Sequence, residues 1–275
     1  MVQQEPMKEA QFKQMMNALG PTEGIPPKRH TWDRHRWEIR RHAKRDDPQK
    51  FLQWSTLTAT MFVGAAPYIE DEFAAISGSN RWLYAIREPG FGDPHRLPYC
   101  EEASGNLVHQ AYHLMNWENA TGQQIGDMKS IVEFGAGYGA MTQVTYQAGY
   151  EGEYWLYDLP EFLLLQQFWL SNIREPWEPY RDYVFCDINE WGYRLPLPTP
   201  DLVIGCWSLS ETSLEQRDDF VNVVSPKSWL LTYQPTWQGI SNDDYFAAFT
   251  QARPEYDWVI EKACMNSKYL FGVKK

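Results

Sequence analysis

The chain has 275 residues, a formal net charge of −11 and a pI near 5.0. This length can bury a large core, as one big domain or two modest ones. The acidic balance argues against a general polyanion-binding protein, because phosphate contacts need a positive surface, so we expect no nucleic-acid partner. No apolar run approaches membrane-spanning length and the N-terminus lacks the layout of a signal peptide, so we expect a cytoplasmic protein without a membrane span.

One segment reverses the sign of the charge. Residues 28–45, "KRHTWDRHRWEIRRHAKR", hold eight Lys or Arg against two Asp or Glu. Such a run is typical of a solvated helix face. The alternative is a local landing site for a phosphate-bearing or acidic substrate, or for an acidic patch on another subunit.

The first 128 residues are expected to be mainly helical. Pro and Gly clusters at 20–27 and 88–98 separate helix-like pieces, such as those at 46–67 and 101–122. We expect residues 1–128 to form a helical cap on a sheet domain of residues 129–275. This cap would contact the substrate or a second subunit, so a homo-oligomer would form through the N-terminal half.

The second half alternates strands and helices. Strands are predicted at 130–136, 153–159, 182–188, 201–208 and 228–234, with helices at 138–148, 160–172, 213–224 and 242–252 between and after them. Two closing strands, 257–264 and 268–275, flank the turn residues "MNS". This pattern predicts an α/β fold with a Rossmann-like, seven-stranded, mostly parallel sheet, to which the C-terminal hairpin adds an antiparallel strand.

The stretch "IVEFGAGYGAMT" (131–142) places three glycines within five residues directly after an apolar run. Gly135, Gly137 and Ala140 satisfy the dinucleotide fingerprint, and Asp158 lies near the distance expected of a ribose-binding acid. The glycines alone therefore leave three alternatives open: a dinucleotide site, a site for a nucleoside without phosphate, and a plain strand-to-helix turn.

Three carboxylates decide between these alternatives. Glu133, at the mouth of the turn, would repel a pyrophosphate and attract an amine or sulfonium. Asp158 closes the second strand and suits ribose hydroxyls. Asp187 closes the third strand, where it can accept from an adenine amino group while Ile188 packs on the ring, or else cap the turn that follows. An acidic crevice at the strand ends favours a nucleoside with a cationic tail, such as S-adenosylmethionine.

The segments "VEFGAGYG", "YDLPE", "CDI" and "DLVIGCWSLSE", with a terminal strand hairpin, resemble class I S-adenosylmethionine-dependent methyltransferases over residues 106–275. More narrowly, "VEFGAGYGAMTQ", "YDLPEFLLLQQFWLSN" and "SLSE" are similar to a family of sugar O-methyltransferases. Its members pair E-x-G-x-G-Y-G with D-L-P-E and a Ser-Glu after the fourth strand.

The resemblance implies S-adenosylmethionine as the cofactor and assigns residues to its parts. Glu133, Gly135, Gly137 and Gly139 would line the methionine end, Asp158 and Leu159 the ribose, and Asp187 and Ile188 the adenine. The remaining cofactor-binding residues would be Ala136, Cys206 and Trp207.

Methyl transfer to a hydroxyl needs alignment and a general base, or a metal acting as Lewis acid. Glu211, beside Trp207, Ser208 and Ser210, is the best-placed carboxylate, unless it only complements the dipole of the following helix. His109 and His113, four apart on a predicted helix, could supply a base or two metal ligands, or be structural histidines. With no third ligand in view, we expect no divalent metal.

The segment after the fifth strand mixes flat apolar faces with polar groups suited to a sugar ring. The candidate acceptor-binding residues are Tyr233, Gln234, Trp237, Asn242 and Asp243. Asn242 and Asp243 could instead be metal ligands, or the cap and first turn of the following helix.

The sequence therefore predicts an S-adenosylmethionine-dependent O-methyltransferase acting on a sugar hydroxyl of a glycan, a nucleotide sugar or a glycosylated small molecule. An aromatic content of 15%, with 13 Trp, accords with a sugar acceptor. Three alternatives are a methyltransferase for a small molecule other than a sugar, an NAD-dependent oxidoreductase, and a non-catalytic S-adenosylmethionine-binding scaffold that acts through its helical half.

Overall fold

The computed structural model describes residues 6–20, 31–173, 182–188 and 199–275. Contacts divide the chain into a first compact unit (Met1–Tyr112, Gly137–Ala148, Leu159–Tyr180) and a second (His113–Ala136, Gly149–Asp158, Arg181–Lys275). The boundary predicted between residues 128 and 129 stays a prediction. Within the described ranges, every helix is too short or too polar to cross a lipid bilayer.

The first unit is mainly helical. Its elements are α1 (Glu9–Ala18), α2 (Thr31–Arg45), the 3-10 segment η1 (Pro48–Gln53), α3 (Ser55–Thr60), α4 (Pro67–Ile76), α5 (Asn80–Ala85), β1 (Arg96–Leu97), β2 (Cys100–Ser104), α7 (Ala140–Gln147) and α8 (Pro160–Asn172). Helix α6 (Gly105–Thr121) contributes residues to both units. Prolines begin α4 and α8 because the first helical position needs no backbone N–H.

Two predicted helix-like pieces differ from the structure. Residues 46–67 form η1 and α3 rather than one helix, because Trp54 between them is extended, with φ −63° and ψ 134°. Residues 101–122 begin as β2, which pairs with β1, before α6 starts at Gly105. A Cβ on Gly105 would lie 2.1 Å from the Gly64 carbonyl oxygen, so this close backbone contact requires glycine.

An aromatic core and a buried ion pair hold the first unit together. Phe12 stacks on Phe168 at 4.4 Å, and Tyr138 meets Trp169 edge-on at 4.8 Å. Glu161, fully buried in the first turn of α8, binds two arginines of α2: Arg36 Nε lies 2.7 Å from Oε2, and Arg40 contacts Oε1. A buried carboxylate needs such partners, so these two arginines are structural rather than free surface charges.

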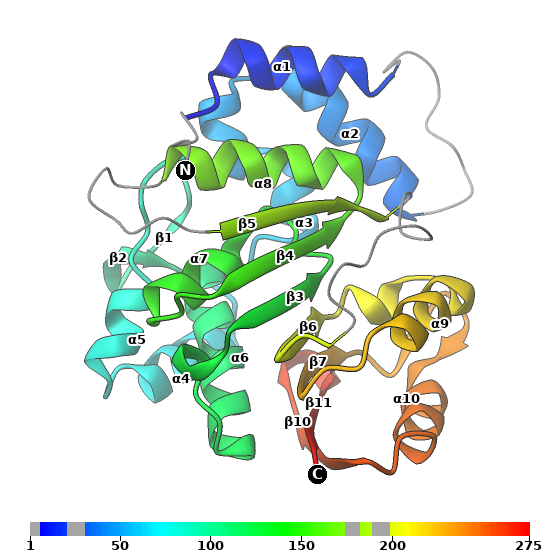
Figure 1. The fold of residues 1–275 in the computed structure, drawn as a ribbon. Helices are drawn as coiled ribbons and strands as arrows, with labels where there is room; N and C mark the ends of the chain where they lie inside the picture. The colour runs from blue at the N-terminus through cyan, green and yellow to red at the C-terminus, as the bar shows by residue number, and fades with distance from the viewer. Residues whose placement is uncertain (1–5, 21–30, 174–181, 189–198) are drawn as a thin grey trace. The chain divides into compact units, whose positions relative to one another are not determined.

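The second unit contains the sheet shown in Figure 1, which confirms the predicted fold class. Seven strands run in the order β10-β11-β7-β6-β3-β4-β5. The pairs from β7 to β5 are parallel, whereas β11 pairs antiparallel with both β10 and β7. The strands are β3 (Ser130–Phe134), β4 (Glu153–Asp158), β5 (Asp182–Asp187), β6 (Leu202–Cys206), β7 (Ser228–Tyr233), β10 (Tyr256–Lys262) and β11 (Lys268–Lys274).

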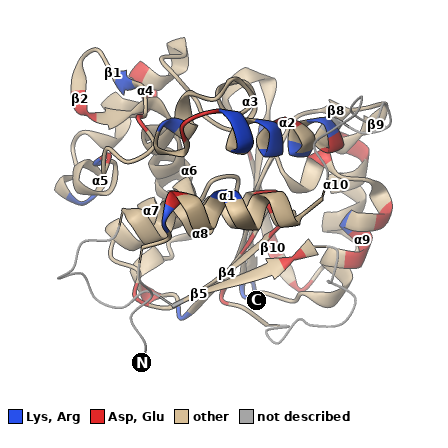
Figure 2. Cartoon of the chain, turned by 90° about the horizontal axis from the view of Figure 1, so that it is seen from above, with Lys and Arg blue, Asp and Glu red and all other residues tan. Residues whose placement is uncertain are grey.

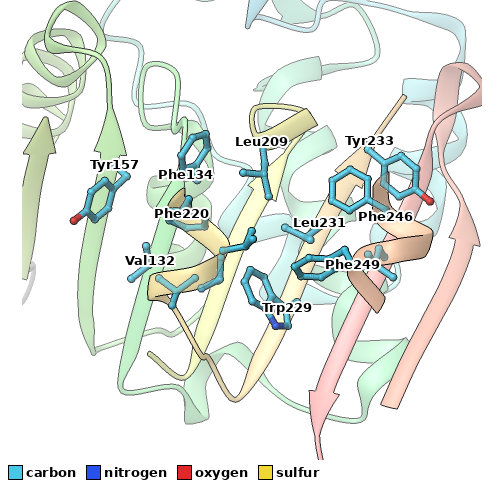
Figure 3. Packing of buried hydrophobic residues seen from close by; sticks show 14 of the residues in the cluster. Val132, Phe134, Tyr157, Leu209, Phe220, Trp229, Leu231, Tyr233, Phe246 and Phe249 are labelled. Atoms are coloured by element: carbon cyan, nitrogen blue, oxygen red, sulfur yellow. The ribbon is translucent and has the colours of Figure 1, made fainter. Parts of the chain in front are cut away.

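One face of this sheet packs on two helices, α9 (Leu214–Val223) and α10 (Asn242–Gln251). Figure 3 shows Phe220 of α9 beside Phe134, and Phe249 of α10 beside Trp229, in a continuous apolar cluster. Both helices start at a serine cap: Ser213 forms a capping box with Gln216, and Ser241 accepts from the Asp244 N–H.

The remaining elements of the second unit are short and were not predicted. They are η2 (Ile125–Asp127), η4 (Leu209–Glu211), the small hairpin β8 (Thr236–Trp237) with β9 (Ile240–Ser241), and η5 (Cys264–Asn266). Segment η5 lies where the first closing strand was expected to continue to residue 264. Met265 and Asn266 there adopt left-handed φ angles of 52° and 60°, which end strand pairing.

Glu88 makes folding stability depend on pH. Burial raises its pKa to about 7, although Ser104 Oγ donates a hydrogen bond to its Oε1. Between the unfolded pKa and about 7 the folded chain binds more protons, so the free energy of unfolding falls as pH rises. We expect Glu88→Gln to unfold like the wild type near pH 4.5 and to be more stable at pH 8 by up to ~3 kcal/mol.

Urea unfolding at both pH values measures this difference. Glu102→Gln is the matched control, since Glu102 is exposed on the neighbouring strand and pairs with Arg87 at 3.4 Å. An advantage of Glu88→Gln that is equal at both pH values would contradict the assignment.

Candidate functional site

The carboxyl ends of the five parallel strands lie at the same edge of the sheet. Strand β3 stands between β4, the next strand in the chain, and β6, so the order of connections reverses between β3 and β6. In open α/β sheets, ligands bind outside the carboxyl ends of strands at such a reversal. This edge is therefore the candidate site of the second unit.

Glu133, Asp158 and Asp187 lie at this edge on one face of the sheet. Side chains alternate between the two faces of a sheet along each strand. Val132, Tyr157 and Cys186 pack in the apolar cluster on the face that α9 and α10 cover. The three carboxylates consequently project from the opposite face. Register places Asp158 directly beside Asp187 and Glu133 beside Leu156.

Two of the three carboxylates at this edge are shielded from water. Glu133 and Asp158 are buried, and Tyr154 Oη donates a hydrogen bond of 2.7 Å to Glu133 Oε2. Like charges side by side in a sheet are unfavourable. The pair of aspartates therefore favours a ligand that brings hydrogen-bond donors or positive charge.

The glycine turn joins β3 to α7 through backbone angles that suit glycine. Gly135, Gly137 and Gly139 have φ of 71°, 60° and 100°. Gly135 has a second reason, because a Cβ there would lie 2.3 Å from Ser208 Cβ. Ser208 Oγ donates to the Phe134 carbonyl, so the ends of β3 and β6 are tied at the reversal.

Trp207 forms a strained turn at the end of β6. Its φ is 60°, and the Ser208 N–H donates to the Cys206 carbonyl across it at 2.8 Å. A γ-turn with a left-handed central residue is rare and costs about 1–3 kcal/mol, so it persists only where its surroundings hold it. Here the Trp207 N–H donates to the Thr232 carbonyl at 2.7 Å, and the indole Nε1 donates to Ser267 Oγ at 3.1 Å.

The two predicted histidines have separate partners. His113 Nδ1 lies 2.6 Å from Tyr269 Oη, and its ring packs edge-on against Trp207 at 5.2 Å. His113 therefore packs against the residue that forms the strained turn. His109, in the first unit, is buried with Nδ1 2.8 Å from Glu72 Oε2 of α4.

Glu211 lies in the turn that follows β6. Burial raises the pKa of its carboxyl to about 7, and the Gln234 amide, 3.3 Å from Oε1, opposes that shift. A carboxyl with this pKa is half ionised near neutral pH, which suits a general base. Burial also raises the pKa of Cys206 to about 12, so this neighbouring residue stays a neutral thiol.

A buried arginine that no sequence motif indicates organises the loop of Glu211. Arg217 of α9 is fully buried and donates to Asn242 Oδ1 at 2.7 Å, to the Thr212 carbonyl at 3.1 Å and to the Ser210 carbonyl. Ser210 Oγ in turn donates to Gln234 Oε1 at 2.8 Å. The turn after β6 and the segment after β7 are thereby locked together. From the sequence alone, Arg217 is expected to be a solvent-exposed charge on the helix.

Two of the five predicted acceptor residues are buried, and the other three are half-buried. Tyr233 and Asn242 are buried: Tyr233 stacks on Phe246 at 4.3 Å, and Asn242 is engaged by Arg217 and the Gln234 carbonyl. Gln234 accepts a hydrogen bond from Ser210 Oγ and donates one to Glu211 Oε1. Trp237 is half-buried in β8, and Asp243 forms an ion pair of 2.7 Å with Lys268. Asn242 and Asp243 lie in the first turn of α10, as one alternative predicted, while the cap itself is Ser241.

The other predicted cofactor residues follow the chain around this edge. Ala136 is buried in the glycine turn, and Ile188 packs against the apolar cluster directly after Asp187. Leu159 precedes α8 as its extended N-cap residue, and with Gly137 and Gly139 it belongs to the first unit. A contact of these residues with a cofactor stays a prediction.

Several solved structures are similar to this chain, whereas no protein-family model and no curated protein sequence matches it. Magnesium protoporphyrin IX methyltransferase from Synechocystis PCC 6803 with bound SAM is 14% identical over 78% of this chain and 100% of its own, with a TM-score of 0.46. The 16S rRNA methylase ArmA is 15% identical over 62% and 86%, with a TM-score of 0.42. The CMeT domain of the citrinin polyketide synthase is 12% identical over 62% and 54%, with a TM-score of 0.45.

Proposed function

We propose that the protein is an S-adenosylmethionine-dependent methyltransferase that methylates a hydroxyl group, and that this hydroxyl belongs to a sugar. One observation supports the choice of this cofactor: Glu133, Asp158 and Asp187 project from one face of the sheet at its carboxyl edge. S-adenosylmethionine would supply an electrophilic methyl group on a sulfonium centre.

The donor set at the edge fits this cofactor better than a dinucleotide. Carboxylates accept hydrogen bonds and attract positive charge, so Asp158 and Asp187 would hold the hydroxyls and amino group of the nucleoside, and Glu133 would face the cationic tail. A pyrophosphate would bring two negative charges to the same place. This repulsion counts against the NAD-dependent oxidoreductase, although the glycine pattern admits it.

Glu211 would take the proton of the acceptor hydroxyl. Its carboxyl is partly buried and accepts a hydrogen bond from Gln234, and it lies on a turn whose Ser210 carbonyl is bound by Arg217. A sugar hydroxyl is a weak nucleophile while protonated, and removal of its proton contributes about 10²–10⁴-fold to such reactions.

A sugar acceptor is supported by the surroundings of Glu211. Trp207 and Trp237 are half-buried and follow β6 and β7 in the chain, in the same segments as the polar residues Gln234 and Asp243. Flat apolar faces beside hydrogen-bonding groups suit the two kinds of surface that a sugar ring presents. A methyltransferase for another small hydroxyl compound would use the same residues.

Cofactor binding is tested by isothermal titration with S-adenosylmethionine, its demethylated product and NADH. We expect the first two to bind, and Asp158→Asn to weaken both at least tenfold, because a hydrogen bond to a charged group contributes about 1.5–3 kcal/mol. Asp257→Asn, an exposed carboxylate on β10, is the matched control and should bind as the wild type does. Binding of NADH alone, or an affinity for S-adenosylmethionine that is unchanged in Asp158→Asn, would contradict the proposal.

The role of Glu211 is tested by the pH dependence of methyl transfer to a panel of free sugars, nucleotide sugars and glycosides, with a simple phenol for comparison. Only ionised Glu211 accepts a proton, so kcat/KM should rise with pH and reach half its limit near pH 7. Glu211→Gln should lose about 100-fold or more in kcat and show no such rise, while cofactor affinity is retained. A wild-type pH profile in this variant would refute the role of Glu211 as general base. Transfer to the phenol alone would refute a sugar as the acceptor.

A further inference from the structure

The basic helix α2 uses its charges in two different ways. Arg36 and Arg40 bind the buried Glu161, as described above. Figure 2 shows the Lys and Arg residues that continue along the helix. Its last two turns line a cavity of about 380 Å³, together with the start of α3; the lining residues are Glu38, Arg41, His42, Arg45, Asp46 and Ser55.

Three of these residues form a chain of hydrogen bonds. Asp46 Oδ2 lies 2.5 Å from His42 Nδ1, and His42 Nε2 lies 3.3 Å from Ser55 Oγ. A carboxylate accepts hydrogen bonds only, so the proton of the neutral imidazole belongs on Nδ1. Nε2 is then the acceptor for the Ser55 hydroxyl. A serine nucleophile, its base and an orienting acid are connected through these same atoms in serine hydrolases, which are recognised by this geometry on unrelated folds.

The imidazole is held in place by more than its hydrogen bonds. His42 stacks on the Trp54 ring with centroids 5.3 Å apart and an interplanar angle of 11°. Asp46 directly follows α2 and its N–H donates to the His42 carbonyl at 2.8 Å, and Ser55 is the first residue of α3, so the backbone also restrains their spacing. Ser55 is exposed, so its hydroxyl is accessible to a small molecule.

The cavity favours an anionic ligand. Glu38 is satisfied by Arg34 at 3.0 Å and Thr56 at 2.8 Å, and Asp46 is satisfied by His42. Within the described ranges no carboxylate forms an ion pair with Arg41 or Arg45, two residues that line the same cavity. They offer positive charge to a carboxylate or to an oxyanion that develops beside Ser55.

We propose that Ser55, His42 and Asp46 form a second reactive site, which takes an acyl group from a small anionic ester. Ser55 Oγ attacks the ester carbonyl and its proton passes to His42 Nε2, while Asp46 stabilises the resulting imidazolium. The carbon–oxygen bond to the alcohol breaks, and the alcohol leaves with the proton from His42. Water then attacks the acyl-serine with the same base, which releases the acid and restores the hydroxyl.

The site is tested on the whole protein with 4-nitrophenyl succinate, a monoanionic ester, and with neutral 4-nitrophenyl acetate. We expect nitrophenolate release, with a succinyl group on Ser55 located by peptide mass mapping after an acid quench. Ser55→Ala should remove both, and His42→Gln should slow release at least tenfold. Arg41→Gln with Arg45→Gln should remove the preference for the anionic ester.

The variants are chosen to keep the fold intact. Ser55 follows the cap residue Trp54 and its side chain caps nothing, so alanine fits there. Ser77→Ala, another exposed serine of the first unit at the end of α4, is the matched control. Release that is unchanged in Ser55→Ala, or acylation of a lysine or cysteine instead, would overturn the proposal. Asp158→Asn should leave this reaction intact, which separates it from the proposed methyl transfer.

Discussion

Parallel pairing in the middle of the sheet is the constraint on which the candidate site depends. Parallel strands send all their carboxyl ends to one edge, and side-chain alternation then decides which face each terminal residue uses. Glu133, Asp158 and Asp187 reach the same face because their strands are paired in one register. A slip of one residue in β4 would move Asp158 to the apolar side. The placement of the three carboxylates is therefore set by strand pairing rather than by the loops that follow the strands.

The part of this arrangement that follows from local patterns could be predicted from sequence. Apolar runs and turn residues located the seven strands, and Asp158 and Asp187 were expected at strand ends, where they lie. Glycine at 135 was expected for a turn, but its tight contact with Ser208 joins segments that are 73 residues apart. No local pattern contains such a contact, so the packing reason for this glycine needed the structure.

The roles of charged side chains were harder to predict, because they depend on partners distant in sequence. Arg217, Arg36 and Arg40 all look like solvent-facing helix charges, yet each serves a buried polar group. His109 and His113 have the spacing of paired ligands, but they turn to different neighbours, Glu72 and Tyr269. Spacing along a helix fixes which side chains share a face, and only tertiary packing fixes what that face meets.

The turn at Trp207 makes the candidate site depend on a distant part of the chain. Its strain is offset by a hydrogen bond to β7 and by the contact of the indole with Ser267, next to β11. The first partner, the Thr232 carbonyl, belongs to β7 itself, whereas the second, Ser267, is in place only after the C-terminal hairpin has joined the sheet. The geometry of the candidate site at the end of β6 therefore depends in part on the docking of a segment 60 residues further along the chain.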